Sequence, residues 1–182
     1  MGLQLLGFLV LLGWSALTVI AVVRLRRRAT PAPRALPPVS ILKPLCGVDL
    51  ALEENLRSFF EQDHPAFELV FGVQSASDPA LALARSLKRQ YPAVACRIVV
   101  HDRAGLNPKV SNLRAMLGAV QHDWVVISDS NVRVGRSWLR ELSAWASTPG
   151  TGLVFNPIAG DFGPGLGAKL EALQLNTNVA AG

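Results

Sequence analysis

Four stretches of this chain are apolar over most of their length and rich in β-branched residues, without a regular alternation of polar residues. They read VSILKPL, FELVFGVQ, CRIVVHD and WVVIS, at 39–45, 67–74, 96–102 and 124–128. A strand that is apolar on both sides must be covered on both sides, which is the situation of a parallel strand between two layers of helices. The sequence therefore predicts an α/β fold, with a mostly parallel sheet and flanking helices.

Helical patterns fill the intervals between these stretches, as such a fold requires. We expect helices at 50–62, 79–91, 109–123 and 137–147, and one more strand at 152–157. An open α/β sheet binds its ligand beyond the carboxyl ends of its strands. Polar side chains occupy those positions here: Lys43 lies late in the first strand, Gln74–Asp78 follow the second, and Asp129–Asn131 follow the fourth.

The first segment of the chain is suited to a membrane. Residues 3–23 form a run of 21 residues without a charge, and a helix of that length reaches about 30 Å, enough to cross a hydrocarbon core. A cleaved signal peptide has a basic start, a shorter apolar run and small residues at the cleavage site, and none of these is clear. A single-pass anchor is therefore favoured over a signal peptide or a buried helix.

The basic residues lie mainly beside this run, and they indicate its orientation. Five arginines follow it, and the positive-inside rule then places the rest of the chain on the cytoplasmic side: Arg24, Arg26, Arg27, Arg28 and Arg34. No acidic residue precedes Asp49, so the remaining sequence has 13 basic and 13 acidic residues and is neutral. The net charge of +5 is thus a local feature, and no nucleic acid is expected as a partner.

Asp78 stands immediately before Pro79, at the start of a predicted helix. Asp before Pro at a helix start is a common capping arrangement, which is one complete explanation of this residue. The other is a contact to the base or ribose of a nucleotide, because the loop lies at the ligand-binding edge of the sheet. The residues themselves leave both open.

Asp129, Ser130 and Asn131 end the fourth apolar stretch abruptly. All three residue types form turns, and a turn alone is one interpretation. The alternative is a metal site, because Mg²⁺ and Mn²⁺ prefer oxygen ligands and are usually shared between one or two carboxylates and substrate phosphates. Asp129 and Asn131 would then be the metal ligands on the protein.

The segment GLNPKVSNL, residues 105–113, places Lys109 and Asn112 at the start of a predicted helix. The backbone N–H groups of a helix start favour an anion, and Lys109 would add a point charge beside a diphosphate. A solvated helix start with Pro108 near its first position is the simpler reading.

Five motifs in this order resemble a known family: VSILKPLCGVD, FFEQDHP, FGVQSASDPA, NPKVSNL and ISDSNVRV. Over about residues 39–178 the chain resembles the ceramide glucosyltransferase family of processive-type, inverting glycosyltransferases. The resemblance implies a type-A nucleotide-sugar-binding fold on a membrane anchor, a UDP-sugar donor, a divalent cation (Mg²⁺ or Mn²⁺) and a membrane lipid as acceptor. It also implies that Asp78 contacts the nucleotide and that Asp129 holds the metal and the diphosphate.

The family pattern continues beyond what this sequence contains. A third aspartate that acts as the base, a Gln-x-x-Arg-Trp motif and further membrane helices are expected after Glu171, the last acidic residue, and Trp145, the last tryptophan. The sequence is therefore predicted to be the donor-binding part of the enzyme, with the base beyond Gly182. We expect an anchor with its basic flank at 1–28, a Pro-rich linker at 29–38 and a partial glycosyltransferase domain at 39–182.

Three functions remain to be weighed. The first is transfer of a hexose from a UDP-sugar to the hydroxyl of a ceramide-like membrane lipid, by a metal-assisted inverting displacement. A hopanoid N-acetylglucosaminyltransferase is a near neighbour with similar motifs, and the residues do not separate the two acceptors. The third is a membrane-tethered nucleotide-sugar-binding fragment without catalysis, whereas the ordered motifs argue against an unrelated α/β signalling module.

Overall fold

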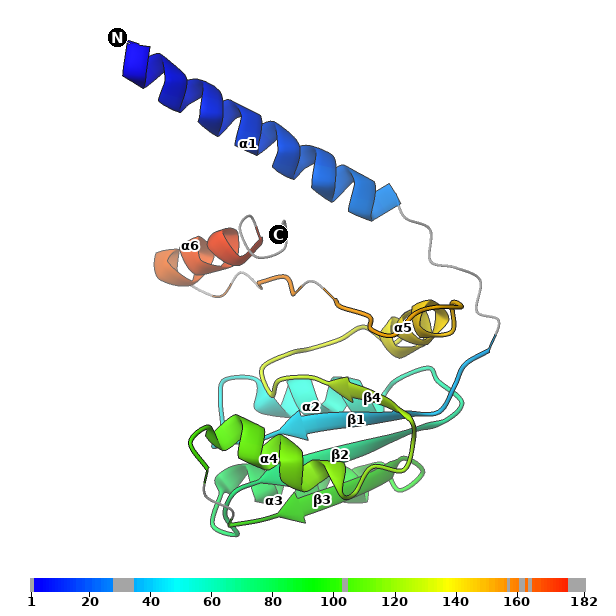
Figure 1. Ribbon diagram of the computed structural model, residues 1–182. Helices are drawn as coiled ribbons and strands as arrows, with labels where there is room; N and C mark the ends of the chain where they lie inside the picture. The colour runs from blue at the N-terminus through cyan, green and yellow to red at the C-terminus, as the bar shows by residue number, and fades with distance from the viewer. Residues whose placement is uncertain are drawn as a thin grey trace. The chain divides into compact units, whose positions relative to one another are not determined.

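The parallel sheet predicted from the sequence is present in the computed structural model, which describes residues 2–27, 35–102, 105–156, 158–160, 163 and 165–176. The chain divides into two compact units, Ala32–Gly152 and the combination of Met1–Pro31 with Leu153–Gly182. The first unit holds a four-stranded sheet in the order β3-β2-β1-β4, with every neighbouring pair parallel (Figure 1). Its strands are β1 (Val39–Pro44), β2 (Phe67–Val73), β3 (Ala95–Val100) and β4 (Trp124–Ile127).

Helices cover both faces of this sheet, as continuous apolar strands require. The helices α2 (Leu52–Phe60) and α3 (Pro79–Gln90) lie on one face, and α4 (Pro108–Leu117) lies on the other (Figure 1). Leu42 of β1 stands beside Val70 of β2 in the register, and both are fully buried in one cluster with Met116 of α4. The next residue along β2 points to the opposite face, where the rings of Phe71 and Phe60 lie 5.8 Å apart.

A fifth helix, α5 (Trp138–Ala146), is held by the segment between α2 and β2. Gln62 accepts a hydrogen bond from the Leu139 N–H at 3.0 Å and donates one to the Gly135 carbonyl at 2.9 Å. Two residues further on, His64 is buried and its Nε2 lies 3.0 Å from the Ser143 hydroxyl. The motif FFEQDHP therefore has a visible structural role, which is to dock α5 onto the domain.

Two boundaries differ from the prediction. Residues 152–156 of the expected strand at 152–157 are not in a strand, and residue 157 lies outside the described residues. Leu153 and Phe155 are 84% and 87% exposed, so this apolar run lacks the burial from which a strand was inferred. The helix expected at 109–123 ends at Leu117, because the chain turns at Gly118 to reach β4.

The second unit contains the membrane-like segment as one helix, α1 (Gly2–Arg27), of 26 residues. Its stretch Gln4–Ala21 has a mean hydropathy of 2.0, and α1 is long and apolar enough to cross a membrane. The hydroxyls of Ser15 and Thr18 donate to the carbonyls four residues earlier, at 2.9 and 3.0 Å. These polar groups are thus satisfied within the helix, which is what a hydrocarbon environment demands.

The same unit contains α6 (Leu166–Gln174). The side-chain amide of Asn176 accepts a hydrogen bond from the Gly160 N–H at 2.6 Å and donates one to the Gly160 carbonyl at 3.1 Å. A Cβ added to Gly160 would stand 2.8 Å from Cα of Ala172, so glycine permits this close approach to α6.

Candidate functional site

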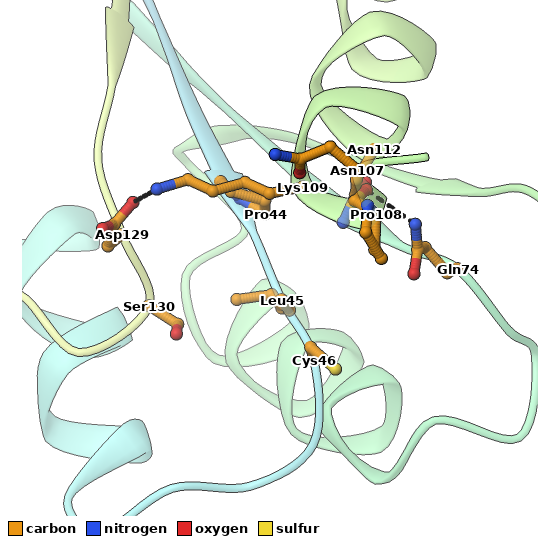
Figure 2. Close-up of a pocket in the computed structure, with 10 residues that line it drawn as sticks. All are labelled: Pro44, Leu45, Cys46, Gln74, Asn107, Pro108, Lys109, Asn112, Asp129 and Ser130. Carbon is orange, nitrogen blue, oxygen red and sulfur yellow. Dashed lines mark hydrogen bonds and ion pairs between the residues drawn. The ribbon is translucent and has the colours of Figure 1, made fainter. Parts of the chain in front are cut away.

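A pocket of about 380 Å³ lies at the carboxyl ends of β1, β2 and β4. The strand order reverses beside β1, which has β2 on one side and β4 on the other, and such a switch point is where open α/β sheets bind ligands. The pocket is lined by Pro44, Leu45, Cys46, Gln74, Asn107, Pro108, Lys109, Asn112, Asp129 and Ser130 (Figure 2).

An ion pair spans this pocket, between Lys109 in the first turn of α4 and Asp129 just after β4. Lys109 Nζ lies 2.5 Å from Asp129 Oδ1 (Figure 2). The two side chains are 52% and 47% exposed, so both charges remain accessible to a ligand in water. The fold thus brings together two residues that the sequence placed at the same edge without pairing them.

The position of Lys109 follows from the way α4 begins. Asn107 caps the helix, since its Oδ1 accepts a hydrogen bond from the Val110 N–H at 3.2 Å. Pro108 follows in the first helical turn, where its missing N–H costs nothing. Gln74, at the end of β2, donates to the Pro108 carbonyl at 2.7 Å. The helix start is therefore fastened to the sheet edge, and its residues Asn107, Pro108 and Lys109 line the pocket.

Asn112 lines the pocket, but the contacts of its polar atoms are internal. It is 3% exposed, its Nδ2 donates to the Gly72 carbonyl at 2.8 Å, and its Oδ1 lies 3.3 Å from Nε2 of His101. A Cβ on Gly72 would stand 2.1 Å from Asn112 Oδ1 and 2.4 Å from Met116 Sδ, so α4 packs directly on a glycine of β2. Asn112 holds α4 against the sheet, and its predicted contact with a substrate stays a prediction.

Lys43 does not belong to the residues that line the pocket. Strand alternation puts it on the same face as Ile41, under α2, where its Nζ lies 3.6 Å from the ring centroid of Phe59. Its ammonium donates to the main-chain carbonyl of Asp129 at 2.7 Å and to the Ser128 hydroxyl at 3.2 Å. Burial lowers the pKa of Lys43 to about 7, and the charge of Asp129 raises it in part.

The observed role of Lys43 is therefore to fasten the end of β1 to the end of β4. The bond to the Asp129 carbonyl fixes the main chain from which that carboxylate projects. The sequence indicated that Lys43 lies near the carboxyl edge, but it did not indicate into which layer the side chain turns. A contact between Lys43 and a substrate has no support in these internal bonds and stays untested.

Asp78 is the N-cap of α3, as one of its two interpretations predicted. It accepts a hydrogen bond from the Ala80 N–H at 2.8 Å and from the Gly47 N–H at 3.1 Å. The second bond ties the loop after β1 to the loop after β2, both at the carboxyl edge of the sheet. Asp78 is half-buried and lies outside the pocket-lining set, and its predicted contact with a nucleotide stays a prediction.

The segment after β4 is a turn and also contributes to the pocket. The Val132 N–H donates to the Asp129 carbonyl at 3.3 Å, which closes the turn. Asp129 and Ser130 line the pocket, whereas Asn131 is exposed and outside the lining set. The predicted role of Asn131 as a second metal ligand stays a prediction.

The donor set decides what kind of cation the site suits. Within the part of the chain that the structure describes, no three His, Cys, Asp or Glu residues gather as a metal cage. A single accessible carboxylate suits Mg²⁺ or Mn²⁺, which a protein usually shares with substrate phosphates. This carboxylate already forms an ion pair with a cation, the ammonium of Lys109. The residues thus fit a cation that arrives with a phosphate ligand.

Cys46, Asn107 and Ser130 are among the lining residues to which the sequence assigned no binding or metal role. Asn107 could have been found, since Asn before Pro is a capping signal at a helix start. Ser130 follows Asp129 directly and shares its turn. Cys46 carries no sequence signal, because its place depends on where the chain leaves β1.

Comparison with sequences of known proteins places the chain among glycosyltransferases. The model of glycosyl transferase family 21 matches residues 5–182. The chain is 40% identical over 114 residues to the ceramide glucosyltransferase of Komagataella phaffii, covering 60% of this chain and 22% of that protein. It is 37% identical over 113 residues to ceramide glucosyltransferase 1 of Caenorhabditis elegans, covering 62% and 24%. The chain thus spans about a fifth to a quarter of the length of these relatives.

Solved structures share the architecture at lower identity. A mannosyltransferase from Pyrobaculum calidifontis, in complex with GDP-Man and Mn²⁺, has a TM-score of 0.61 and 23% identity, over 80% of this chain and 45% of that one. The TarS protein of S. aureus in complex with UDP-GlcNAc has a TM-score of 0.52 and 18% identity, over 68% and 38%. At these identities the likeness concerns the fold alone.

Proposed function

Because the chain belongs to glycosyl transferase family 21, we propose that it binds the donor of an enzyme that transfers a hexose from a UDP-sugar to a lipid hydroxyl. Its fold is the type-A glycosyltransferase fold, as the sequence predicted. The observation that carries the proposal is the pocket at the carboxyl edge, where Asp129 and Lys109 present opposite charges to one space (Figure 2). A sugar diphosphate with its cation is a ligand that uses both charges.

The diphosphate lies, in this proposal, between the start of α4 and the turn after β4. Lys109 then moves from Asp129 to the phosphate oxygens, where the N–H groups of the helix start add to the positive potential. Asp129 would hold Mg²⁺ or Mn²⁺, which when bound would neutralise negative charge on the leaving nucleoside diphosphate. Lys43 positions Asp129 indirectly, because its Nζ is bonded to the main-chain carbonyl of Asp129 and not to the carboxylate.

The nucleoside is assigned to the neighbouring loops, around Asp78. This carboxylate already joins the loops after β1 and β2 through Gly47 and Ala80. A carboxylate has acceptor capacity beyond these bonds, and the family resemblance assigns it to the nucleotide. The two similar structures contain nucleotide sugars, GDP-Man and UDP-GlcNAc, which supports a donor of that class here.

A membrane lipid is the proposed acceptor, with a ceramide-like lipid as the first choice. The relatives named above are ceramide glucosyltransferases, and α1 has the length and composition of an anchor. The arginines after residue 23 place the domain on the cytoplasmic side in this proposal. An enzyme held at the bilayer surface meets a lipid hydroxyl without extracting the lipid into water.

A second candidate is a membrane-tethered nucleotide-sugar-binding module without catalysis. One observation favours it: Asp129 is the single carboxylate among the ten residues that line the pocket. Inverting transfer needs a base at the acceptor hydroxyl, and a carboxylate that holds the cation does not serve as that base. Sugar transfer to a lipid by the full chain would exclude this candidate, and donor binding without transfer would favour it.

Calorimetric titration of UDP into the full chain in detergent, with Mn²⁺ and with a chelator, tests the donor site. Asp129→Asn should remove most of the metal dependence, because a neutral amide is a weaker ligand for a hard cation. Mutation of a residue that only hydrogen-bonds to a metal ligand lowers metal affinity about 10- to 100-fold. Replacement of the ligand itself, as in Asp129→Asn, should therefore lower metal affinity at least about tenfold. Asp78→Asn should weaken UDP binding both with and without metal.

Asp123→Asn is the matched control, because Asp123 is exposed at the opposite end of β4 and should leave binding unchanged. If UDP binds equally well with the chelator, and Asp129→Asn has no effect, Asp129 has no metal role. If UDP does not bind to the wild-type chain under any of these conditions, the donor-site assignment is wrong.

A further inference from the structure

The ammonium of Lys109 is bonded to Oδ1 of Asp129, and both side chains line the pocket. It lies 2.5 Å from Oδ1, so a second cation at that carboxylate meets a like charge close by. The main chain of Asp129 is held by Lys43 and by the Val132 N–H. The main chain of Asp129 is therefore fixed, and its carboxylate projects from it on a single methylene, whereas Lys109 has a flexible four-carbon stem and is the partner with the longer reach.

We propose that Lys109 is a built-in cation that blocks Asp129 until a divalent metal arrives together with a nucleoside diphosphate. The inference rests on the proposed function and adds an order of binding to it. Metal alone binds weakly, because it must displace Lys109. Metal with the diphosphate binds well, because the diphosphate offers the displaced ammonium a new partner.

The composition of the pocket is what makes the displacement costly. Asp129 is the single carboxylate among the ten lining residues. An ammonium displaced from Asp129 by a lone cation thus finds no second carboxylate among them, so it exchanges an ion pair for water and is repelled by the cation that displaced it. A diphosphate offsets both the lost ion pair and the repulsion, since its oxygens accept hydrogen bonds from the ammonium and also bind the metal.

Lys43 cannot act as the displaceable cation, although it also contacts Asp129. Its Nζ contacts the main-chain carbonyl of Asp129, and its side chain is fully buried under α2. Lys43 therefore keeps its place whether the carboxylate holds an ammonium or a metal. Lys109 is the residue that couples the two ligands, and by linkage the diphosphate strengthens metal binding by the same factor as the metal strengthens diphosphate binding.

The test measures Mn²⁺ binding to the full chain in detergent, without nucleotide, from the electron paramagnetic resonance signal of free Mn²⁺. Lys109→Met removes the charge, retains most of the apolar stem and adds no oxygen ligand. It should tighten Mn²⁺ binding roughly 1.5- to fivefold, which is the range expected for losing an exposed, partly screened ion pair. Lys109→Arg keeps the blocking charge and should bind Mn²⁺ as the wild type does. Lys88→Met, an exposed site at the end of α3, is the control for loss of a lysine elsewhere.

A second arm adds Asp129→Asn to Lys109→Met, and this double variant should lose the gain in Mn²⁺ affinity. A third arm repeats the titrations with UDP present. UDP should tighten Mn²⁺ binding strongly in the wild type and by a smaller factor in Lys109→Met, which starts tighter and has lost the diphosphate contact.

The inference is overturned if Lys109→Met binds Mn²⁺ alone no more tightly than the wild type. It is also overturned if Lys109→Arg gains as much as Lys109→Met, or if the gain survives in the double variant. Metal-dependent UDP binding in the wild type, together with any of these results, would leave the proposed function in place and remove only the blocking role. Absence of metal-dependent UDP binding in the wild type would instead refute the donor site.

Discussion

Replacing Lys43 with methionine should change how the stability of this protein depends on pH. Lys43 is fully buried, and burial lowers its pKa from 10.5 to about 7. A base whose pKa is lower in the folded chain binds fewer protons there than in the unfolded chain, at every pH between the two values. The free energy of unfolding should therefore rise with pH from about 7 to about 10.5. Lys43→Met has no amine at this position and should lack that rise.

The size of the effect follows from the same two pKa values. In the middle of the window the free energy of unfolding gains about 1.4 kcal/mol for each pH unit. The curve flattens near pH 7, where the folded chain also takes up the proton. Between pH 7 and 9.5 we therefore expect a rise of about 2–3 kcal/mol that the methionine variant lacks. Below pH 7 the amine is protonated in both states and contributes no further dependence.

Urea unfolding of the full chain in detergent, at several values from pH 7 to 9.5, measures this difference. Near-UV circular dichroism is a suitable signal, because Trp138 packs edge-on against Phe59, the ring under the Lys43 ammonium. Subtracting the variant from the wild type removes the contribution of every other titrating group. Lys88→Met, at an exposed lysine, should keep the wild-type slope. Equal slopes in the wild type and Lys43→Met would refute the burial argument.

Two further changes test other parts of the structure. Gly72→Ala should lower the free energy of unfolding by about 1–3 kcal/mol, because the new Cβ would stand 2.1 Å from Asn112 Oδ1. Gly118→Ala, whose Cβ would meet nothing closer than 3.7 Å, should instead raise it by about 0.4–1 kcal/mol, and similar urea midpoints for the two would contradict the packing at Gly72. A reporter enzyme fused after Arg34 should be active only on the cytoplasmic side, and activity outside the cytoplasm would reverse the orientation inferred from the arginines.

The parallel sheet and the long apolar helix α1 could be predicted from the sequence because both depend on local composition. A strand apolar on both sides, such as β2, requires cover on both faces wherever it lies in a fold. The start of α3 was equally readable, since Asp78 before Pro79 is a capping signal, and the same kind of signal, Asn107 before Pro108, precedes α4. The expected strand at 152–157 shows the limit of this reasoning. An apolar run predicts a strand only if a neighbour pairs with it, and composition does not show the neighbour.

The location of the candidate site at the carboxyl edge of the sheet could be predicted from the sequence, but the contacts between its residues could not. Asp129 and Lys109 could be assigned to the carboxyl edge from their positions after a strand and at a helix start. That they form one ion pair was decided by the strand order, which sets β4 beside β1 and brings the start of α4 to the same edge. The pleat of β1 turned Lys43 into the layer under α2, and the close packing of α4 on Gly72 committed the amide of Asn112 to the sheet. Sequence periodicity records which residues share a face of one element, whereas contacts between elements depend on order, register and packing, which exist only in the folded chain.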